Sequence, residues 1–268
     1  MENFYDFIII IYILDLIDKS YPSHNYNSSW PGSFMSHENS ESDLRAVYCA
    51  LVIADILGIL DEDISKGVAE NIKKCQTFEG GLGPEPYCEA HGGYSFCGIG
   101  ALIILNKLDF IDVERFIRWL VNKQMTKEGG FQGRTNKLVD SCYSTWQGGV
   151  FNMLINYDKK KYSYDSELLY DQLALQAYIL MCCQAPNGGM IDKPGKQPDL
   201  FHTNYALLGL ALSQKTLLDN EFTISLSYDE ELNFLNIDPV FTINAQKLKN
   251  AKVHFRNKII QDNLEKYI

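Results

Sequence analysis

Apolar residues recur at helical spacing along most of the chain, and this pattern is the main structural signal in the sequence. Apolar side chains at positions i, i+3 and i+4 form one face of a helix, which can then be buried. The predicted helices cover residues 43–60 (with Ser42 as the N-cap), 64–75, 93–108, 112–125, 142–155, 166–183, 200–213 and 244–255. No segment shows the period-two alternation that is typical of a half-buried strand. The sequence therefore predicts an all-α fold.

The predicted helices are organised as a repeat. Each unit has a helix ending in a Cys-Gln or Lys-Gln step, a Gly-rich loop, and a second helix that begins with small and aromatic residues. Three units are complete, and residues 31–34 resemble a degenerate earlier copy; the intervals from Gly32 to Gly80, Gly129 and Gly188 are 48, 49 and 59 residues. Repeats of this kind are typical of stacked helical hairpins. If the hairpins curl into a ring of inner and outer helices, all the loops lie at one end and the residues after them converge on a central cavity.

Potential metal ligands follow two of the loops. Asp140, Cys142 and His202 offer a carboxylate, a thiolate and an imidazole from neighbouring hairpins. Three protein ligands and one open position are typical of a catalytic zinc site. The spacing leaves two other interpretations open, in which Cys142 belongs to the core and His202 is an ordinary hydrogen-bonded histidine.

The segment 129–146 also favours an anion site. Its glycines allow a tight turn, Asp140 can cap a helix start, and a loop with Arg134 and Lys137 ahead of a helix N-terminus is a suitable place for an anion. His91 and Tyr143 could complete such a cradle. The alternative is a set of solvated loop charges. Four further aromatic residues could line an apolar channel or simply fill the core: Tyr48, Tyr94, Trp146 and Tyr205.

Composition limits the classes of function. The net charge is −10 and the pI is near 5.0, which argues against a general surface for nucleic acid or anionic membranes. Seven cysteines, an odd number, without a secretory n-region favour a reduced, cytoplasmic protein. The apolar run at residues 7–14 is shorter than the ~20 residues of a membrane span and has the wrong flank for a signal peptide. We expect it to be a buried helix rather than an integral membrane segment.

Five sequence blocks together resemble the β subunit of protein farnesyltransferase. They are ESDLRAVYCALVIADIL (41–57), EAHGGYSFCGIGAL (89–102), EGGFQGRTNKLVDSCYSTW (128–146), MCCQAPNGGMIDKPGK (181–196) and DLFHTNYALLGLAL (199–212). The likeness extends from about residue 32 to residue 255. It implies an α-α toroid that pairs with a helical-repeat α subunit to form a heterodimer. It also implies a toroid domain over residues 32–268 and a divergent segment over 1–31, so that the ring is expected to be incomplete at its N-terminal side.

The resemblance assigns a role to each candidate residue. It implies one Zn²⁺ held by Asp140, Cys142 and His202, with the fourth position taken by the substrate cysteine. It implies a diphosphate site at His91, Arg134, Lys137 and Tyr143, with Lys137 and Tyr143 acting in catalysis, and Mg²⁺ supported by Asp192. The isoprenoid channel would be lined by Tyr48, Tyr94, Cys97, Trp146 and Tyr205, and Arg45 would face the peptide.

The function implied by the resemblance is transfer of farnesyl from farnesyl diphosphate to a cysteine near the C-terminus of substrate proteins. Asp192 and the bulky Tyr205 favour farnesyl over geranylgeranyl transfer. Phe201 stands where these enzymes usually have tyrosine, which affects one expected peptide contact. The alternatives are a geranylgeranyltransferase β subunit and a truncated, non-catalytic helical scaffold.

Overall fold

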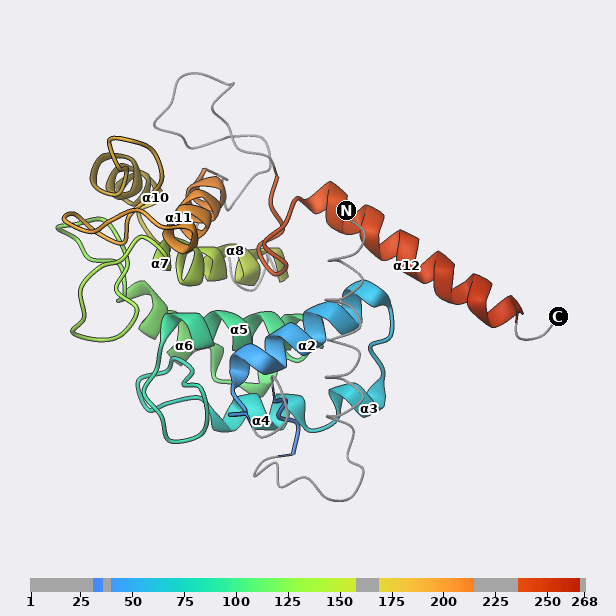
Figure 1. Ribbon diagram of the computed structural model, residues 1–268. Coiled ribbons are helices and arrows are strands. Elements are labelled where there is room, and N and C mark those ends of the chain that lie inside the picture. The colour runs from blue at the N-terminus through green and yellow to red at the C-terminus, as the bar shows by residue number, and fades with distance from the viewer. Residues whose placement is uncertain (1–30, 36–39, 158–168, 215–235, 266–268) are drawn as a thin grey trace.

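The computed structural model describes residues 31–35, 40–157, 169–214 and 236–265, and within these ranges it is built from helices and loops (Figure 1). The elements are α2 (Leu44–Leu57), α3 (Glu62–Ser65), α4 (Val68–Lys74), α5 (Gly92–Ile104), the 3-10 turn η1 (Leu108–Phe110), α6 (Val113–Val121), α7 (Tyr143–Trp146), α8 (Gly148–Tyr157), α10 (Gln172–Ala177), the π-helical turn η2 (Tyr178–Cys182), α11 (Leu200–Ser213) and α12 (Ala245–Glu265). Extended pairing in the described ranges is limited to isolated bridges in loops. The predicted all-α class is confirmed.

Several helix boundaries differ from the predictions for local reasons. Asp43, not Ser42, is the N-cap of α2, because its carboxylate accepts the amide hydrogens of Arg45 and Ala46. The same helix ends early because Gly58 takes a left-handed conformation with φ 73°. The helix predicted over 64–75 is broken at Gly67, which also has positive φ and separates α3 from α4.

Other boundaries changed in the second half of the chain. The helix predicted over 142–155 is interrupted at Gln147 and forms α7 and α8, and the one predicted over 112–125 ends at Val121. The last helix extends to Glu265, ten residues beyond the predicted 255. The start of the predicted 166–183 helix and the whole predicted helix over 7–14 lie outside the described residues. No helix that the structure describes combines the length and apolar character needed to cross a membrane.

A glutamine clasp in two successive loops demonstrates the repeat. The Gln76 side-chain nitrogen donates to the carbonyls of Gly80 and Asp112, and its oxygen accepts the Asp112 amide hydrogen. Gln124 makes the same three bonds with Gly129 and Asp171. Asp112 and Asp171 are the N-caps of α6 and α10. Each loop is therefore fastened to the first turn of the next outer helix.

Glycine allows this close approach between repeats. Gly80 has φ 110°, and a Cβ there would lie 2.3 Å from the Arg115 carbonyl oxygen in α6. Gly129 has φ 78° and stands in the same relation to Ala174 in α10, at 2.5 Å. In the degenerate copy, a Cβ on Gly32 would lie 2.1 Å from the backbone of Gly67, just before α4. Residues 31–34 therefore use the packing of the full repeats.

The inner helices pack in chain order. α2 lies against α5, α5 against α7 and α8, and these against α11 (Figure 1). The largest fully buried side chains include Phe96, Phe116, Phe131 and Phe151. α12 extends away from the body and is fastened at its base by a 2.5 Å ion pair between Lys252 and Asp55 of α2. Because each inner helix follows its loop, the N-terminal ends of α5, α7 and α11 bring the candidate site residues together.

Candidate metal centre and anion site

Backbone bonds fix the two potential ligands on α7 and the loop before it. The Cys142 amide donates to Asp140 Oδ1 at 2.8 Å, which closes a tight turn around Ser141. Ser141 itself is buried and bonded to the loop of the next repeat. Its hydroxyl donates to the Ile191 carbonyl at 2.7 Å, and its amide donates to the Asp192 carbonyl at 2.8 Å. The carboxylate and the thiol are therefore positioned by the same loop that precedes α11.

α11 lies close enough to α7 to add its histidine. A Cβ on Gly209 would lie 1.9 Å from Ser144 Oγ, so only glycine permits this contact. The Thr145 hydroxyl also donates to the Tyr205 carbonyl across the interface, at 2.6 Å. These contacts set the distance between the two helices at the end where Cys142 and His202 lie.

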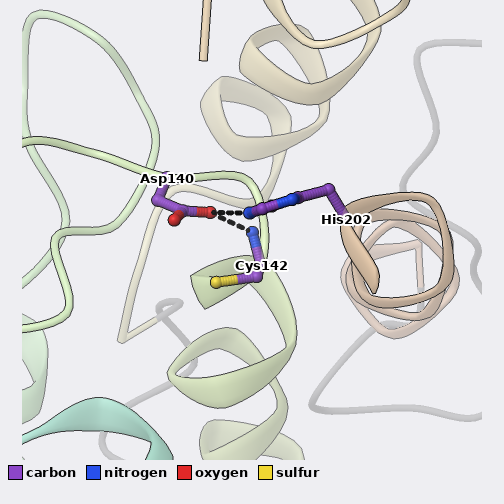
Figure 2. A group of neighbouring side chains, drawn as sticks. All are labelled: Asp140, Cys142 and His202. Atoms are coloured by element: carbon purple, nitrogen blue, oxygen red, sulfur yellow. Dashed lines mark hydrogen bonds and ion pairs between the residues drawn. The ribbon is translucent and has the colours of Figure 1, made fainter. Parts of the chain in front are cut away.

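Asp199 orients the imidazole of His202. It is the N-cap of α11 and accepts the His202 amide hydrogen at 2.7 Å. Its second carboxylate oxygen lies 2.6 Å from His202 Nδ1. The other ring nitrogen, Nε2, consequently faces Asp140 Oδ1 at 3.4 Å (Figure 2). A carboxylate behind a ligating histidine fixes its tautomer and is the usual second partner of such a ligand.

The three predicted ligands meet in one cluster (Figure 2). One carboxylate oxygen, the thiol sulfur and one imidazole nitrogen of Asp140, Cys142 and His202 all lie within 4.8 Å of one another. Oxygen, sulfur and nitrogen donors in this number fit zinc, which keeps an open fourth position in catalytic sites. Cys142 is only 5% exposed, whereas the side chains of Asp140 and His202 are 20% and 17% exposed.

Burial disfavours the deprotonated, negatively charged forms of Asp140 and Cys142 unless a positive charge lies beside them. It raises the pKa of the Asp140 carboxyl, with opposition from the hydrogen bonds of Cys142 and a further increase from Asp192. Burial, followed by the proximity of Asp140, raises the pKa of the Cys142 thiol well above its ordinary range. A divalent cation reverses both effects because it favours the deprotonated form of each group.

A second set of groups forms beside the cluster. His91 caps α5 by accepting the Gly93 amide hydrogen on Nδ1 at 3.0 Å. Burial and the nearby Arg134 lower the pKa of His91, so the neutral ring is favoured. With Nδ1 accepting, the ring proton lies on Nε2, which is 3.1 Å from the Tyr143 hydroxyl oxygen. The hydroxyl hydrogen of Tyr143 can then point to another acceptor.

The loop with the predicted cations lies over this pair. A Cβ on Gly133 would lie 1.9 Å from Cζ of Tyr143, so glycine makes the room that the ring occupies. The Gly133 carbonyl accepts the Gly92 amide hydrogen at 2.9 Å, which joins the loop to the start of α5. Arg134 is paired with Glu89 at 3.2 Å, and Lys137 is exposed three residues further on. The structure thus brings His91, Tyr143 and the Arg134 loop together.

Three of the predicted channel residues, Tyr48, Trp146 and Tyr205, are connected through Phe96. Tyr205 and Trp146 have ring centroids 4.2 Å apart, and Phe96 contacts both Trp146, at 5.1 Å, and Tyr48, at 5.7 Å. The four predicted aromatic residues, Tyr48, Tyr94, Trp146 and Tyr205, are all half-buried rather than enclosed in the core. Cys97, the fifth predicted channel residue, is buried. Half-buried aromatic faces support the interpretation of these residues as a lining.

Comparison with known families explains this combination. The family model described as "Prenyltransferase alpha-alpha toroid domain" matches residues 14–249. The chain belongs to this family. The predicted toroid fold and the resemblance to farnesyltransferase β subunits are therefore confirmed.

Three relatives of this toroid protein show how similar it is to known protein prenyltransferases. It is 38% identical to the farnesyltransferase β subunit of Pisum sativum over 239 residues, which cover 68% of this chain and 57% of the relative. It is 43% identical to the farnesyltransferase β subunit of Schizosaccharomyces pombe over 182 residues, which cover 67% of this chain and 48% of the relative. A solved structure titled "Candida albicans protein geranylgeranyltransferase-I complexed with GGPP" matches with a TM-score of 0.62 and 25% identity, over 84% of this chain and 62% of that one. The chain spans about half the length of the curated relatives it matches.

Two residues of the toroid protein have partners that the sequence did not predict. Arg45, expected to face a peptide, has a side chain that is 64% exposed and bonded to the carboxylate of Asp43. Its guanidinium also lies 5.3 Å from the centroid of the Tyr94 ring. Asp192, expected to support Mg²⁺, has both carboxylate oxygens bonded to the ammonium of Lys193.

Two further residues with a part in the site were missing from the predicted set. Asp199 was detectable, because an Asp three residues before a histidine at a helix start is a typical N-cap arrangement. Glu89 was not, because only the fold brings it to Arg134 from the preceding repeat. The predicted boundary between residues 1–31 and 32–268 falls where the described residues begin, and it stays a prediction.

Proposed function

We propose that this chain is the catalytic β subunit of a zinc-dependent protein farnesyltransferase. With an α subunit, it transfers farnesyl from farnesyl diphosphate to a cysteine near the C-terminus of substrate proteins. One arrangement above all supports this proposal. Cys142, Tyr143 and Trp146 follow one another on a single turn of α7, and at ~1.5 Å rise per residue they span only about 6 Å along the helix. A thiol ligand, an anion donor and an apolar wall are therefore adjacent.

Asp140, Cys142 and His202 are the residues that would hold zinc. When bound, zinc lowers the pKa of a coordinated substrate thiol, so that the thiolate is present near neutral pH. The protein holds the three ligand side chains in place before the metal binds. Asp199 fixes the ring of His202, and Ser141 fixes the turn between the other two ligands. The open side of the cluster is where the substrate sulfur would enter.

The donors next to the cluster suit the diphosphate of the lipid substrate. When the allylic C1–O bond breaks, the diphosphate gains negative charge. Tyr143, Arg134 and Lys137 supply an O–H group and two cations on the same side, and a well-placed donor of this kind contributes ~3–4 kcal/mol to the transition state. Arg134 exchanges its Glu89 partner for a phosphate oxygen. Asp192 would support Mg²⁺, which adds Lewis-acid stabilisation of the leaving group.

The half-buried aromatic group suits the isoprenoid. Burial of a lipid chain contributes ~0.8 kcal/mol per CH₂ group. Tyr205 lies against Trp146 at 4.2 Å and would limit the length of the channel, which favours the shorter farnesyl chain. The alternative supported by the Candida albicans structure is geranylgeranyl transfer.

The test uses the full chain co-expressed with an α subunit. Metal analysis should find one zinc per heterodimer, and farnesyl diphosphate should be the preferred donor in a panel of isoprenoid diphosphates and peptides that differ in the last residue. Preference for geranylgeranyl diphosphate would assign the chain to the alternative activity. Zinc below about 0.1 per heterodimer would favour a non-catalytic scaffold.

Two cysteine variants sharpen this experiment. Cys142→Ala should abolish zinc retention while the helical circular dichroism spectrum stays largely intact, because α7 keeps its backbone bonds. Cys182→Ala removes an exposed thiol and is the matched control. Equal zinc content in the two variants would contradict the ligand assignment.

A further inference from the structure

A buried lysine lies beneath the loop that carries the two predicted cations. Lys123 follows α6 and is 3% exposed, and it is the one charged residue among the buried polar residues of the described ranges. Lysine is rarely buried unless its charge is compensated. Its ammonium lies 5.1 Å from the centroid of the Trp119 ring, so one side of the charge faces an aromatic surface. The other side faces the Arg134 loop.

A chain of two hydrogen bonds connects Lys123 to that loop and to the loop of the preceding repeat. The Lys123 ammonium donates to Thr135 Oγ1 at 2.7 Å. The Thr135 hydroxyl in turn donates to Glu79 Oε2 at 2.6 Å. Thr135 is the residue directly after Arg134, and its hydroxyl is used both as an acceptor and as a donor. The loop is therefore held from below by a charged pair that acts through a single hydroxyl.

The base of the loop is anchored by further bonds, among them that of the Asp140 amide to the Phe131 carbonyl at 3.2 Å. The Gln132 amide donates to the Lys123 carbonyl at 2.9 Å, and the Gln132 carbonyl accepts from the Gln147 side chain at 2.7 Å. Beyond Gly133 the backbone turns through Asn136, which has φ 61°. Asparagine adopts this left-handed conformation more readily than most residues, so the turn suits this position. Just before this turn, the Lys123–Thr135–Glu79 chain and the Arg134–Glu89 pair are the side-chain contacts of the loop.

Charge supports the same role. Burial lowers the pKa of Lys123, and the nearby carboxylates of Glu79 and Glu89 oppose this shift. Glu89 is also the partner of Arg134. Lys123, Arg134 and Lys137 together outweigh the two carboxylates by one positive charge. Without Lys123 the two carboxylates would cancel the cations that face an arriving anion.

From this we infer that Lys123 is a positioning residue for diphosphate binding: acting through Thr135, it holds the Arg134–Lys137 loop in place. It touches no substrate itself. The inference rests on the proposed function, because the loop is taken to bind the diphosphate.

The test measures the affinity of the full chain, co-expressed with an α subunit, for inorganic pyrophosphate. Thr135→Val keeps the shape of the side chain and removes the hydroxyl, and it should weaken binding on the order of ten-fold, because both hydrogen bonds of that hydroxyl have a charged partner. Thr135→Ser restores the hydroxyl and should stay within about two-fold of wild type. Lys123→Met should weaken binding by about ten-fold or more, because it removes a positive charge as well as the bond to Thr135. Lys127→Met, which removes an exposed lysine of the same hairpin, is the matched control.

Further measurements separate positioning from a general loss of structure. Affinity for farnesol, which lacks the diphosphate, and zinc content should be unchanged in all four variants. The double variant of Lys123→Met and Thr135→Val should bind no more weakly than Lys123→Met alone, because the chain is already broken. If Lys123→Met does not fold, the comparison of Thr135→Val with Thr135→Ser still tests the inference. Equal pyrophosphate affinity for Thr135→Val and Thr135→Ser overturns this inference alone. A wild-type protein that does not bind pyrophosphate overturns the proposed anion site and this inference with it.

Discussion

The contact between Gly133 and Tyr143 offers a direct test of how the site is built. Gly133→Ala adds one methyl group at a position that does not require positive φ, so the backbone tolerates alanine there. The new Cβ would lie 1.9 Å from Cζ, 2.2 Å from Oη and 2.4 Å from Cε1 of Tyr143. The substitution therefore acts first on the tyrosine ring, which supplies the three nearest atoms.

The size of the effect follows from these distances. Carbon atoms in contact lie about 3.5–4.0 Å apart, so the ring must retreat by about 1.6 Å from its 1.9 Å position. The hydroxyl is 3.1 Å from His91 Nε2, and a shift of that size exceeds the range of a hydrogen bond. One lost bond costs about 0.5–1.5 kcal/mol, and overpacking costs about 1–3 kcal/mol. The ring tip can rotate, so we expect about 1–3 kcal/mol of lost stability.

Two assays check this expectation. Urea unfolding should show the loss of stability, and the rate of the proposed farnesyl transfer should fall by on the order of 100-fold at most, since in that proposal the hydroxyl stabilises the leaving group. Gly148→Ala is the matched control, because its Cβ would have ordinary contacts at 3.4 Å and 3.7 Å. In the Gly133→Ala background, Tyr143→Leu should regain stability without regaining rate. Normal stability and normal rate for Gly133→Ala would refute the reasoning.

Two further predictions concern the partners of the site histidines. Asp199→Asn keeps the N-cap but weakens the bond to His202 Nδ1, and zinc affinity in a chelator competition should fall by about 10–100-fold; unchanged affinity would contradict the orienting role of Asp199. The second concerns pH. The folded state lowers the pKa of His91, so its contribution to stability is complete above the unfolded value near ~6.5. That contribution is lost as pH falls through the lower folded value. Asparagine also caps helices but does not titrate, so His91→Asn is the comparison. Between pH 7.5 and 5.5, the free energy of urea unfolding should fall more for wild type than for His91→Asn. Equal decreases would show that His91 is not the source of the pH dependence.

The sequence pattern predicted the parts of the structure that depend on local chemistry. Helical periodicity predicted the all-α fold, and the helix over 200–213 matches α11 at both ends. The glycine spacing predicted the repeat, because Gly80 and Gly129 must each approach the next outer helix, whereas a Cβ on Gly188 would meet no atom within 4 Å. The combination of Asp140, Cys142 and His202 was predictable because the repeat places the residues after the loops at one end. These three side chains then meet within 4.8 Å.

The remaining features depend on contacts between residues far apart in the sequence. The break at Gln147 follows from tertiary contacts, since its side chain bonds the Gln132 carbonyl and packs against Gly92. The pairing of Arg134 with Glu89 joins two repeats, and so does the chain from Lys123 to Glu79. From sequence alone, charged side chains on loops are expected to be exposed to solvent. Only the three-dimensional structure shows which of them are paired.

The two glutamine clasps allow this dependence on neighbouring repeats to be measured. Gln76 and Gln124 make identical bonds, but Gln124 joins the repeat that supplies Asp140 and Cys142 to the one that supplies His202. Gln76→Leu and Gln124→Leu each remove three bonds and should each cost about 2–4 kcal/mol of stability. Only Gln124→Leu should speed zinc loss to a chelator, because of the two clasps only this one joins the repeats that supply the ligands. If both variants lost zinc at the same rate, global destabilisation would explain the effect, and the site would owe its geometry to the whole fold instead of to one joint between repeats.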